Sequence, residues 1–287
     1  LVNPMIGPDL LSPCYATEPG RLPDVDTNDW CAPGNRVGVS VEGASGVRIG
    51  IDPAAPRDED RNVIASNTRE GIRLDATSTT ALVAGNYIGT NADGVCVPHP
   101  VTAQCSTGNA GSGVLVLGRD HVIGHESHPN ILGDNGGVDR GSVFTTTSAI
   151  RVEGPAAVGN AVVGNRVGVD VTEANPLYED GIAIVGATNT RVEANIVGTI
   201  GVDGATGTQV LRNLVGLFPD GETAIGAYAH EGLSVQGSGG VLVTGAARNT
   251  TIGGNTIAGN TERPGVWILA QAVDTVIERN MLGFASG

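Results

Sequence analysis

The chain has 287 residues, with 30 acidic side chains against 16 basic ones, all of them arginine, and a formal net charge of −14. An acidic surface repels phosphate backbones, so the composition argues against a nucleic acid partner. Hydrophobic residues make up 40% and aromatic residues only 3%, which excludes disorder and a core of large rings. No apolar run of about 18 residues is present, so no membrane span is expected.

Residues 1–33 are rich in proline and acidic side chains, and we expect them to form an irregular N-terminal cap or entry segment before a repetitive domain at 34–287. The abrupt start at Leu1 indicates a piece of a longer or processed protein. Four cysteines lie in the first third of the chain: Cys14, Cys31, Cys96 and Cys105. Three disulfide pairings are open, of which Cys14–Cys31 with Cys96–Cys105 is the most local. Disulfides would fit an oxidising extracellular setting, and free buried thiols are the alternative.

From residue 34 onward the chain repeats a short alternating strand followed by a turn built on asparagine. A long excursion interrupts this repeat at about 92–110, and residues 118–147 are its least regular portion, with one more turn at Asn130–Gly133. In the four clearest copies the asparagine follows the first strand residue by 15, 16, 14 and 15 positions. These copies are Gly71–Leu74 with Asn86, Ala149–Val152 with Asn165, Gly181–Ile184 with Asn195, and Gly265–Ile268 with Asn280. A near-constant offset predicts an all-β solenoid: a single-stranded, right-handed parallel β-helix with loop excursions.

The asparagines are expected at one corner of the coil. Asparagine tolerates the left-handed conformation that a sharp corner needs, and its amide can bond the amides of the layers above and below. The predicted corner residues are Asn86, Asn165, Asn195, Asn213 and Asn280. We interpret their role as structural rather than catalytic.

The segment Gly85–Gly94 resembles the G-N-x-I-G-T-x-x-x-G coil of right-handed parallel β-helix repeats in bacterial secreted and cell-surface proteins. The resemblance covers most of residues 34–283. It implies the fold and an extracellular or cell-surface location. Proteins of this kind include polysaccharide lyases, epimerases, glycosidases, adhesins and phage tail spikes, so the resemblance does not select an activity.

The outward faces of the strands form the first candidate site. One expected column reads Ser40, Arg73, Leu115, Arg151, Ala183, Ser234 and Trp267, and the next reads Glu42, Asp75, Leu117, Glu153, Val185, Gln236 and Leu269. Arg151 and Glu153 are weak catalytic candidates for lyase chemistry, and surface ion pairing is the alternative. The outward apolar residues Leu115, Leu117, Val185 and Leu269 predict a covering loop or protein. Trp267 is the best side chain for stacking on a sugar.

Asp-Gly pairs follow three of the asparagine turns, at Asp93, Asp203 and Asp220. If the coils stack, Asp203 and Asp220 come from neighbouring layers and could bind a cation or sugar hydroxyls, with catalysis as a weaker reading. Calcium is the cation that such a site would bind, and no other cofactor is expected. The alternative is ordinary turn chemistry, because Asp-Gly is a favoured turn pair.

His121, His125 and His128 form a second candidate, because imidazole is a common metal ligand and Asp134 lies nearby in sequence. Their spacing on an irregular loop enforces no geometry. A solvated loop is the alternative interpretation.

The leading functional hypothesis is an extracellular structural or adhesive module of a surface protein or appendage. Its partners would be other protein chains, with a homo-oligomer or filament as one form, or a polysaccharide. Whether the chain is an enzyme stays open, although the paired-aspartate, Asp-Pro-His-Asp and Arg-x-Pro-x-x-Arg signatures of related enzymes are missing. The rivals are a secreted polysaccharide lyase, epimerase or hydrolase, and a carbohydrate-binding module without turnover.

Overall fold

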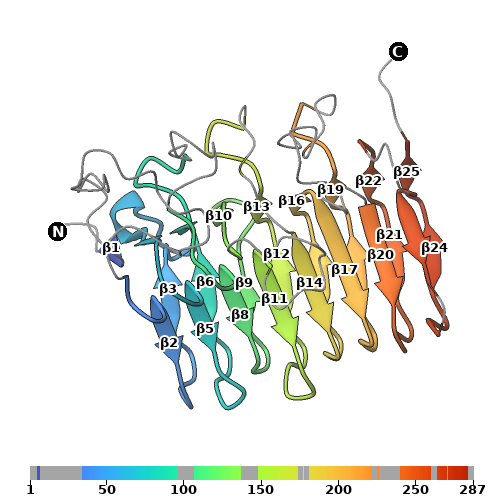
Figure 1. Ribbon diagram of the computed structural model, residues 1–287, viewed down its shortest axis with the longest axis horizontal. Coiled ribbons are helices and arrows are strands. Elements are labelled where there is room, and N and C mark those ends of the chain that lie inside the picture. Colours follow the sequence, from blue (N-terminus) through green and yellow to red (C-terminus); the bar gives the residue numbers. More distant parts are fainter. Residues whose placement is uncertain are drawn as a thin grey trace, which may run out of the picture.

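The computed structural model describes residues 5–6, 34–95, 107–136, 148–173, 177, 181–220, 225, 240–259, 264–269 and 271–283. Their strands form three sheets in which every pairing is parallel, and the strands of each sheet follow one another in sequence order. Figure 1 shows the coils stacked along the long axis, from β2 near the N-terminus to β24 and β25 near the C-terminus. The chain is therefore a parallel β-helix, as the repeat predicted.

Each coil contributes one strand to each sheet. Sheet I has eight strands: β2 (Val39–Val41), β5 (Ile72–Leu74), β8 (Val114–Val116), β11 (Ile150–Glu153), β14 (Ile182–Val185), β17 (Thr199–Asp203), β20 (Gly240–Thr244) and β23 (Val266–Ile268). Sheet II also has eight: β3 (Arg48–Gly50), β6 (Leu82–Ala84), β9 (Val122–Ile123), β12 (Ala161–Val163), β15 (Arg191–Glu193), β18 (Gln209–Leu211), β21 (Thr251–Gly253) and β24 (Val276–Glu278).

Sheet III has nine strands: β1 (Met5–Ile6), β4 (Val63–Ile64), β7 (Tyr87–Ile88), β10 (Ile131–Leu132), β13 (Arg166–Val167), β16 (Ile196–Val197), β19 (Leu214–Val215), β22 (Thr256–Ile257) and β25 (Met281–Leu282). A 3-10 helix, η1 (Asp58–Asp60), lies in the charged loop after β3. No helix among the described residues is long and apolar enough to span a membrane. Of the expected N-terminal cap, only β1 is described, and it pairs with β4.

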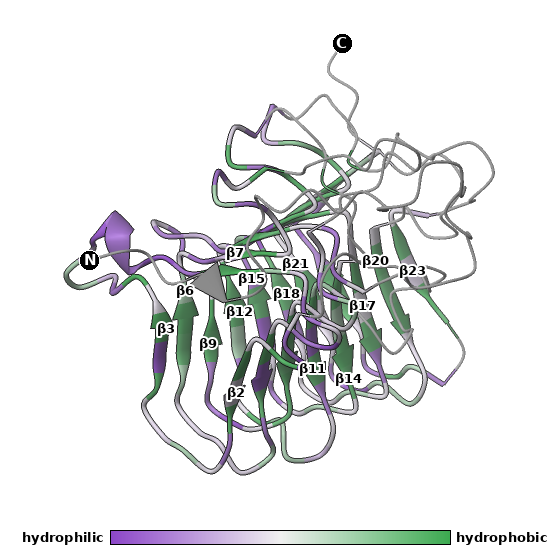
Figure 2. Ribbon diagram, turned by 60° about the vertical axis from the view of Figure 1, so that its left-hand side comes forward, coloured by the Kyte–Doolittle hydropathy of each residue, from purple (hydrophilic) through white to green (hydrophobic). Residues whose placement is uncertain are grey.

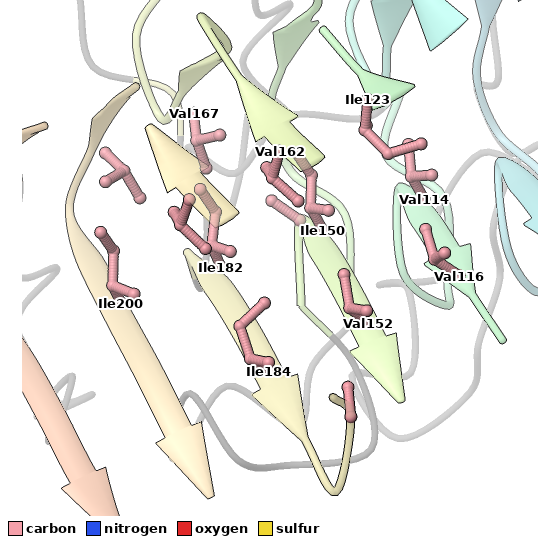
Figure 3. Packing of buried hydrophobic residues seen from close by; sticks show 14 of the residues in the cluster. Val114, Val116, Ile123, Ile150, Val152, Val162, Val167, Ile182, Ile184 and Ile200 are labelled. Atoms are coloured by element: carbon pink, nitrogen blue, oxygen red, sulfur yellow. The ribbon is translucent and has the colours of Figure 1, made fainter. Parts of the chain in front are cut away.

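The interior is filled by aliphatic side chains because the strand residues alternate between the two faces of each sheet. In β5, Ile72 and Leu74 are fully buried, while Arg73 between them points outward. The same alternation in each coil produces one continuous core of valine, isoleucine, leucine and alanine. Figure 3 shows this packing, with Ile150, Ile182 and Ile200 of successive sheet I strands in one row. Figure 2 shows the strands coloured largely as hydrophobic.

The register of sheet I differs from the expected one at two coils. β17 pairs with β14, so Ile200 lies beside Ile182, only 18 residues earlier. The Asp203-Gly204 pair had instead predicted a turn and loop for this segment. β20 then pairs with β17, so Leu242 and Thr244 occupy the places expected for Ser234 and Gln236, which lie outside the described residues. The segments around Ser234 and Leu242 have the same alternating sequence pattern, so only contact with the preceding coil determines which of them forms the strand.

Candidate functional site

The asparagine corner is a continuous ladder of side-chain amides. The Nδ2 group of each asparagine donates to the Oδ1 atom of the asparagine in the next coil, at 2.9 to 3.0 Å. The ladder runs through Asn62, Asn86, Asn130, Asn165, Asn195, Asn213, Asn255 and Asn280. The structure thus brings together all five asparagines named from sequence. Six of these Oδ1 atoms also accept a main-chain N–H from the preceding coil, those of Asn86, Asn130, Asn195, Asn213, Asn255 and Asn280.

A second, shorter ladder occupies the corner between sheets III and I, and sequence reasoning missed it. Asn67 donates from Nδ2 to Oδ1 of Asn109, and Asn109 donates likewise to Asn135, both at 2.7 Å. A usable signal was present, because Asn67 and Asn135 each follow a first-ladder asparagine by five positions. The signal failed for Asn109, since the excursion after β7 separates it from Asn86 by 23 positions.

The outward face of sheet I carries the predicted pair of Arg151 and Glu153. The Nε group of Arg151 donates to Oε2 of Glu153 at 2.8 Å, within the single strand β11. Arg151 is only 6% exposed, and Ala183, its outward neighbour on β14, is fully buried. Arg151 and Ala183 are therefore shielded from solvent, whereas the Glu153 side chain is 41% exposed.

The carboxylate of Asp75 has a local structural task. Its Oδ1 atom accepts main-chain N–H groups from Gly43, Thr77 and Ser78, at 3.2, 3.0 and 2.8 Å. Burial raises the pKa of Asp75, and the hydrogen bonds from Thr77, Gly43 and Ser78 outweigh it, so the pKa lies below the usual value. A carboxylate held in this way stabilises the turn after β5 and is a poor general base.

The three Asp-Gly aspartates lie in different parts of the molecule. Asp203 is the last residue of β17 and pairs with Val185 and Thr244 in sheet I. Asp93 lies in the turn after β7, and Asp220 lies in the turn after β19, both following sheet III. Sheet III places β10, β13 and β16 between β7 and β19. Asp203 therefore ends a sheet I strand, whereas Asp220 lies in a turn that follows sheet III, so the two do not leave the same corner of the coil.

The three histidines are divided between the interior and the surface. His121 is fully buried, and its Nδ1 atom accepts the N–H of Ala81 at 2.9 Å. His125 and His128 are half-buried, and both contact the hydroxyl of Ser127. Among the described residues, no group of three or more histidine, cysteine or acidic side chains is arranged to hold a metal ion. The predicted histidine metal site is not assembled.

His121 acts as a corner residue. Because Nδ1 is the acceptor, the neutral ring carries its proton on Nε2, which lies 3.2 Å from the hydroxyl of Ser78. Burial lowers the pKa of His121 below its ordinary value, against smaller opposing effects of Ser78, Asp120 and Asp75. In the next coil Asn160 takes the equivalent place, and its Oδ1 atom accepts the N–H of His121 at 2.9 Å.

An ionic cluster on sheet II went unnoticed in the sequence. Glu193 of β15 is 6% exposed and pairs with Arg191 of its own strand and with Arg212 of the next coil. The signal available was the Arg-x-Glu spacing, which β15 shares with Arg151 and Glu153 of β11. In both strands the two side chains emerge on the same face and neutralise each other.

Trp267 lies on the outward side of β23, in the last described coil, where it pairs with Leu242. Its side chain is half-buried. The four cysteines lie outside the described residues, and so does the proposed disulfide pairing.

Comparison with known proteins does not add a family to this fold. No protein-family model matches the chain, and no curated protein sequence matches it significantly. The class of protein defined by the structure is the parallel β-helix solenoid.

Proposed function

We propose that the protein is an extracellular structural or adhesive β-helix module of a surface protein or appendage. The observation that carries the proposal is the unbroken ladder from Asn62 to Asn280, which links every successive coil of the described helix. Together with three parallel sheets it makes a rod in which each layer is fixed to the next. The resemblance of Gly85–Gly94 to coils of bacterial secreted and surface proteins supports the location.

The ladder supports a mechanical role because of how its bonds are shared. In a solenoid each repeat contacts only its neighbours, so stability depends on the interface between adjacent coils. Each interior amide donates to the following coil and accepts from the preceding one, and the buried position keeps water from competing for these bonds. The rod therefore resists separation of its layers along its whole described length.

The placement of the charged side chains favours this role over catalysis. Glycoside hydrolysis requires two carboxyl groups about 5 to 10 Å apart across a sugar ring. The candidates instead serve local structure: Arg151 pairs with Glu153, and Asp203 ends a strand several coils from Asp93. These contacts stabilise the coils locally and do not bring the candidate side chains together as a catalytic centre requires.

A carbohydrate-binding module without turnover is the second candidate function, and Trp267 favours it. An indole on the outward side of a strand offers a flat apolar surface for a sugar ring. The half-buried state of Trp267 leaves part of that surface open to solvent. Binding of a neutral or acidic oligosaccharide would then change the tryptophan fluorescence, and Trp267→Ala would remove that change.

The deciding experiment is incubation with a panel of acidic and neutral polysaccharides, with and without Ca²⁺. We expect no new reducing ends and no unsaturated products. Turnover that Arg151→Ala or Asp203→Ala abolishes, in proteins that keep the wild-type circular dichroism spectrum, would replace the structural proposal with an enzymatic one. Saturable binding without products, lost in Trp267→Ala, would establish the binding module.

A further inference from the structure

Two imidazole rings converge on one hydroxyl group in the loop between β9 and β10. The Nδ1 atom of His125 lies 2.9 Å from the Oγ atom of Ser127, and the Nδ1 atom of His128 lies 2.8 Å from the same oxygen. The ring centroids are 5.9 Å apart, and the ring planes are inclined by 39°. Both Nδ1 atoms therefore face one point, which the hydroxyl of Ser127 occupies.

The hydrogen bonds show how these nitrogens are protonated. The main-chain N–H of Ser127 donates to Nδ1 of His125 at 3.3 Å, so this nitrogen is an acceptor. The hydroxyl of Ser127 then donates to His125 and accepts from His128, because a hydroxyl has one hydrogen and two lone pairs. The neutral His125 ring thus offers the lone pair of Nδ1, and His128 offers the same lone pair after a change of tautomer.

The backbone that holds the two rings is fixed by the coils around it. The N–H of His128 donates to the carbonyl oxygen of His125 at 3.1 Å, which closes a turn. The main chain of Glu126 packs on the next coil, where a Cβ atom added to Gly164 would lie 2.6 Å from the nitrogen of Glu126. Asn130, two residues after His128, belongs to the asparagine ladder. The rings are therefore attached to a backbone of defined shape.

The pair is accessible from solution. Ser127 is exposed, and His125 and His128 are half-buried. His121 is fully buried, and its ring contacts Ser78 within the coil, so it takes no part in the pair. A small ion can therefore reach the two Nδ1 atoms from the solvent side of the loop without entering the β-helix.

The charges around the pair permit a cation to bind. Glu126 lies between the two histidines in sequence, and its side chain is 63% exposed. Arg212 of a later coil lies 4.0 Å from that carboxylate, so the two local charges balance. The whole chain has a net charge of −14, which attracts cations rather than anions at long range.

We propose that His125 and His128 bind one divalent transition-metal ion through their Nδ1 atoms, at the point that the Ser127 hydroxyl occupies. Imidazole suits Zn²⁺, Ni²⁺ and Cu²⁺, whereas Ca²⁺ and Mg²⁺ prefer oxygen ligands. A metal–nitrogen bond is about 2.0 to 2.1 Å long, so each nitrogen moves about 0.8 Å toward the shared point once the hydroxyl turns away. Two protein ligands leave the remaining coordination positions to water or to a ligand from another molecule.

This two-histidine site does not depend on the proposed structural role, because it requires neither a polysaccharide nor a second chain. The test is isothermal titration calorimetry of the full chain, stripped of metal and treated with iodoacetamide to block any free thiol. We expect binding of Cu²⁺ that is tighter than binding of Ni²⁺ or Zn²⁺, and no binding of Ca²⁺. His125→Ala and His128→Ala should each weaken the binding of Cu²⁺ by about tenfold or more.

Two further variants serve as controls. His121→Asn removes the third histidine of this stretch without changing the pair, so it should bind Cu²⁺ as the wild type does. Ser127→Ala removes only the hydroxyl between the rings, so it should retain binding. All four variants should keep the wild-type circular dichroism spectrum, because the substitutions at the pair lie outside the core and asparagine fits the corner at residue 121.

Electron paramagnetic resonance of the Cu²⁺ complex identifies the ligands directly. The wild type and Ser127→Ala should show coupling to two imidazole nitrogens, and each histidine variant should show fewer. The proposal would be overturned by equal affinity for Cu²⁺ in the wild type and both histidine variants, or by no binding at all. A loss in His121→Asn or Ser127→Ala as large as that in His128→Ala would overturn it too.

Discussion

The side-chain Nδ2 group of Asn165 donates to the Oδ1 atom of Asn195 at 2.9 Å, although 30 residues separate the two. The main-chain N–H of Asn165 donates to the same oxygen, also at 2.9 Å. One side chain thus satisfies two donors of the preceding coil, and the same relation recurs along the ladder.

The first prediction concerns Asn195→Ala. The change removes the acceptor of two Asn165 donors and the donor that bonds Val162 and Asn213. Each buried polar group left without a partner costs about 1 to 3 kcal/mol, so we expect a loss of about 3 to 5 kcal/mol in the free energy of unfolding. Denaturant titration followed by circular dichroism measures it.

Asn280→Ala is the matched control for that prediction. Asn280 accepts from Asn255 in the same way but lies in the last described coil, where water can replace the lost bonds. We expect its cost to be less than half that of Asn195→Ala. Equal costs would show that the ladder contributes no more in the interior than at the end.

The second prediction is a pH dependence that originates at His121. The folded-state pKa of His121 is lowered, so folding favours the neutral ring. The stability is fully present above the unfolded pKa of about 6.5 and is lost as pH falls from there toward the folded pKa. Protonation would also place a hydrogen on Nδ1, which now accepts the N–H of Ala81.

His121→Asn isolates this effect. Asn160 already fills the equivalent position one coil later with an amide oxygen as acceptor, so asparagine can keep the bond to Ala81 without titrating. We expect the midpoint of urea unfolding to fall between pH 7.5 and pH 5 by more in the wild type than in His121→Asn. Parallel curves for the two proteins would show that the pH dependence does not originate at His121.

The third prediction compares two glycines with positive φ. Gly89 has φ of +80°, and an added Cβ atom would lie 2.0 Å from the carbonyl oxygen of Gly133 in the next coil. Gly186 has φ of +60° with no heavy atom within 4 Å of the Cβ position. Gly186→Ala should cost only the left-handed conformation, about 1 to 2 kcal/mol, and Gly89→Ala clearly more because two coils must separate. Thermal unfolding of both variants checks the order.

The fourth prediction concerns the ionic cluster on sheet II. Glu193→Gln removes the negative charge that pairs with Arg191 and Arg212. Because the carboxylate of Glu193 is nearly buried, its two ion pairs are stronger than exposed ones. We expect the free energy of unfolding to fall by about 1 to 2 kcal/mol. The decrease should be smaller in high salt, because the arginines remain hydrated and salt screens their charge. Asp58→Asn, which breaks an exposed pair with Arg61, should cause no measurable change in the same unfolding assay.

Local patterns predicted the class of fold because the repeated unit is itself local. The offset between a strand such as Gly71–Leu74 and its asparagine lies within a single coil, so the near-constant offsets of Asn86, Asn165 and Asn280 from their strands were visible in the sequence. The strands of sheet II were not recognised in the sequence, because segments of two or three residues, such as Val122–Ile123, are too short to show a hydrophobic period.

The candidate site depended on register, and register is not local. Asp203 was assigned to a loop because a Gly follows it, yet hydrogen bonds to β14 and β20 make it the end of a strand. His121 was grouped with His125 and His128 by spacing, although the alternation of corner and turn residues places its ring in the core. Histidines that are close in sequence therefore occupy different environments: the ring of His121 is buried, and His125 and His128 are half-buried.

The sequence alone determined that this chain coils and that asparagine forms its corner, because both follow from residues within one turn of the helix. Only the tertiary structure decided which strand lies beside which, where the second ladder runs and that the His121 ring lies in the interior. Those properties arise from the stacking of one coil on another, and the intervening excursions, of different lengths, conceal that stacking from any local pattern.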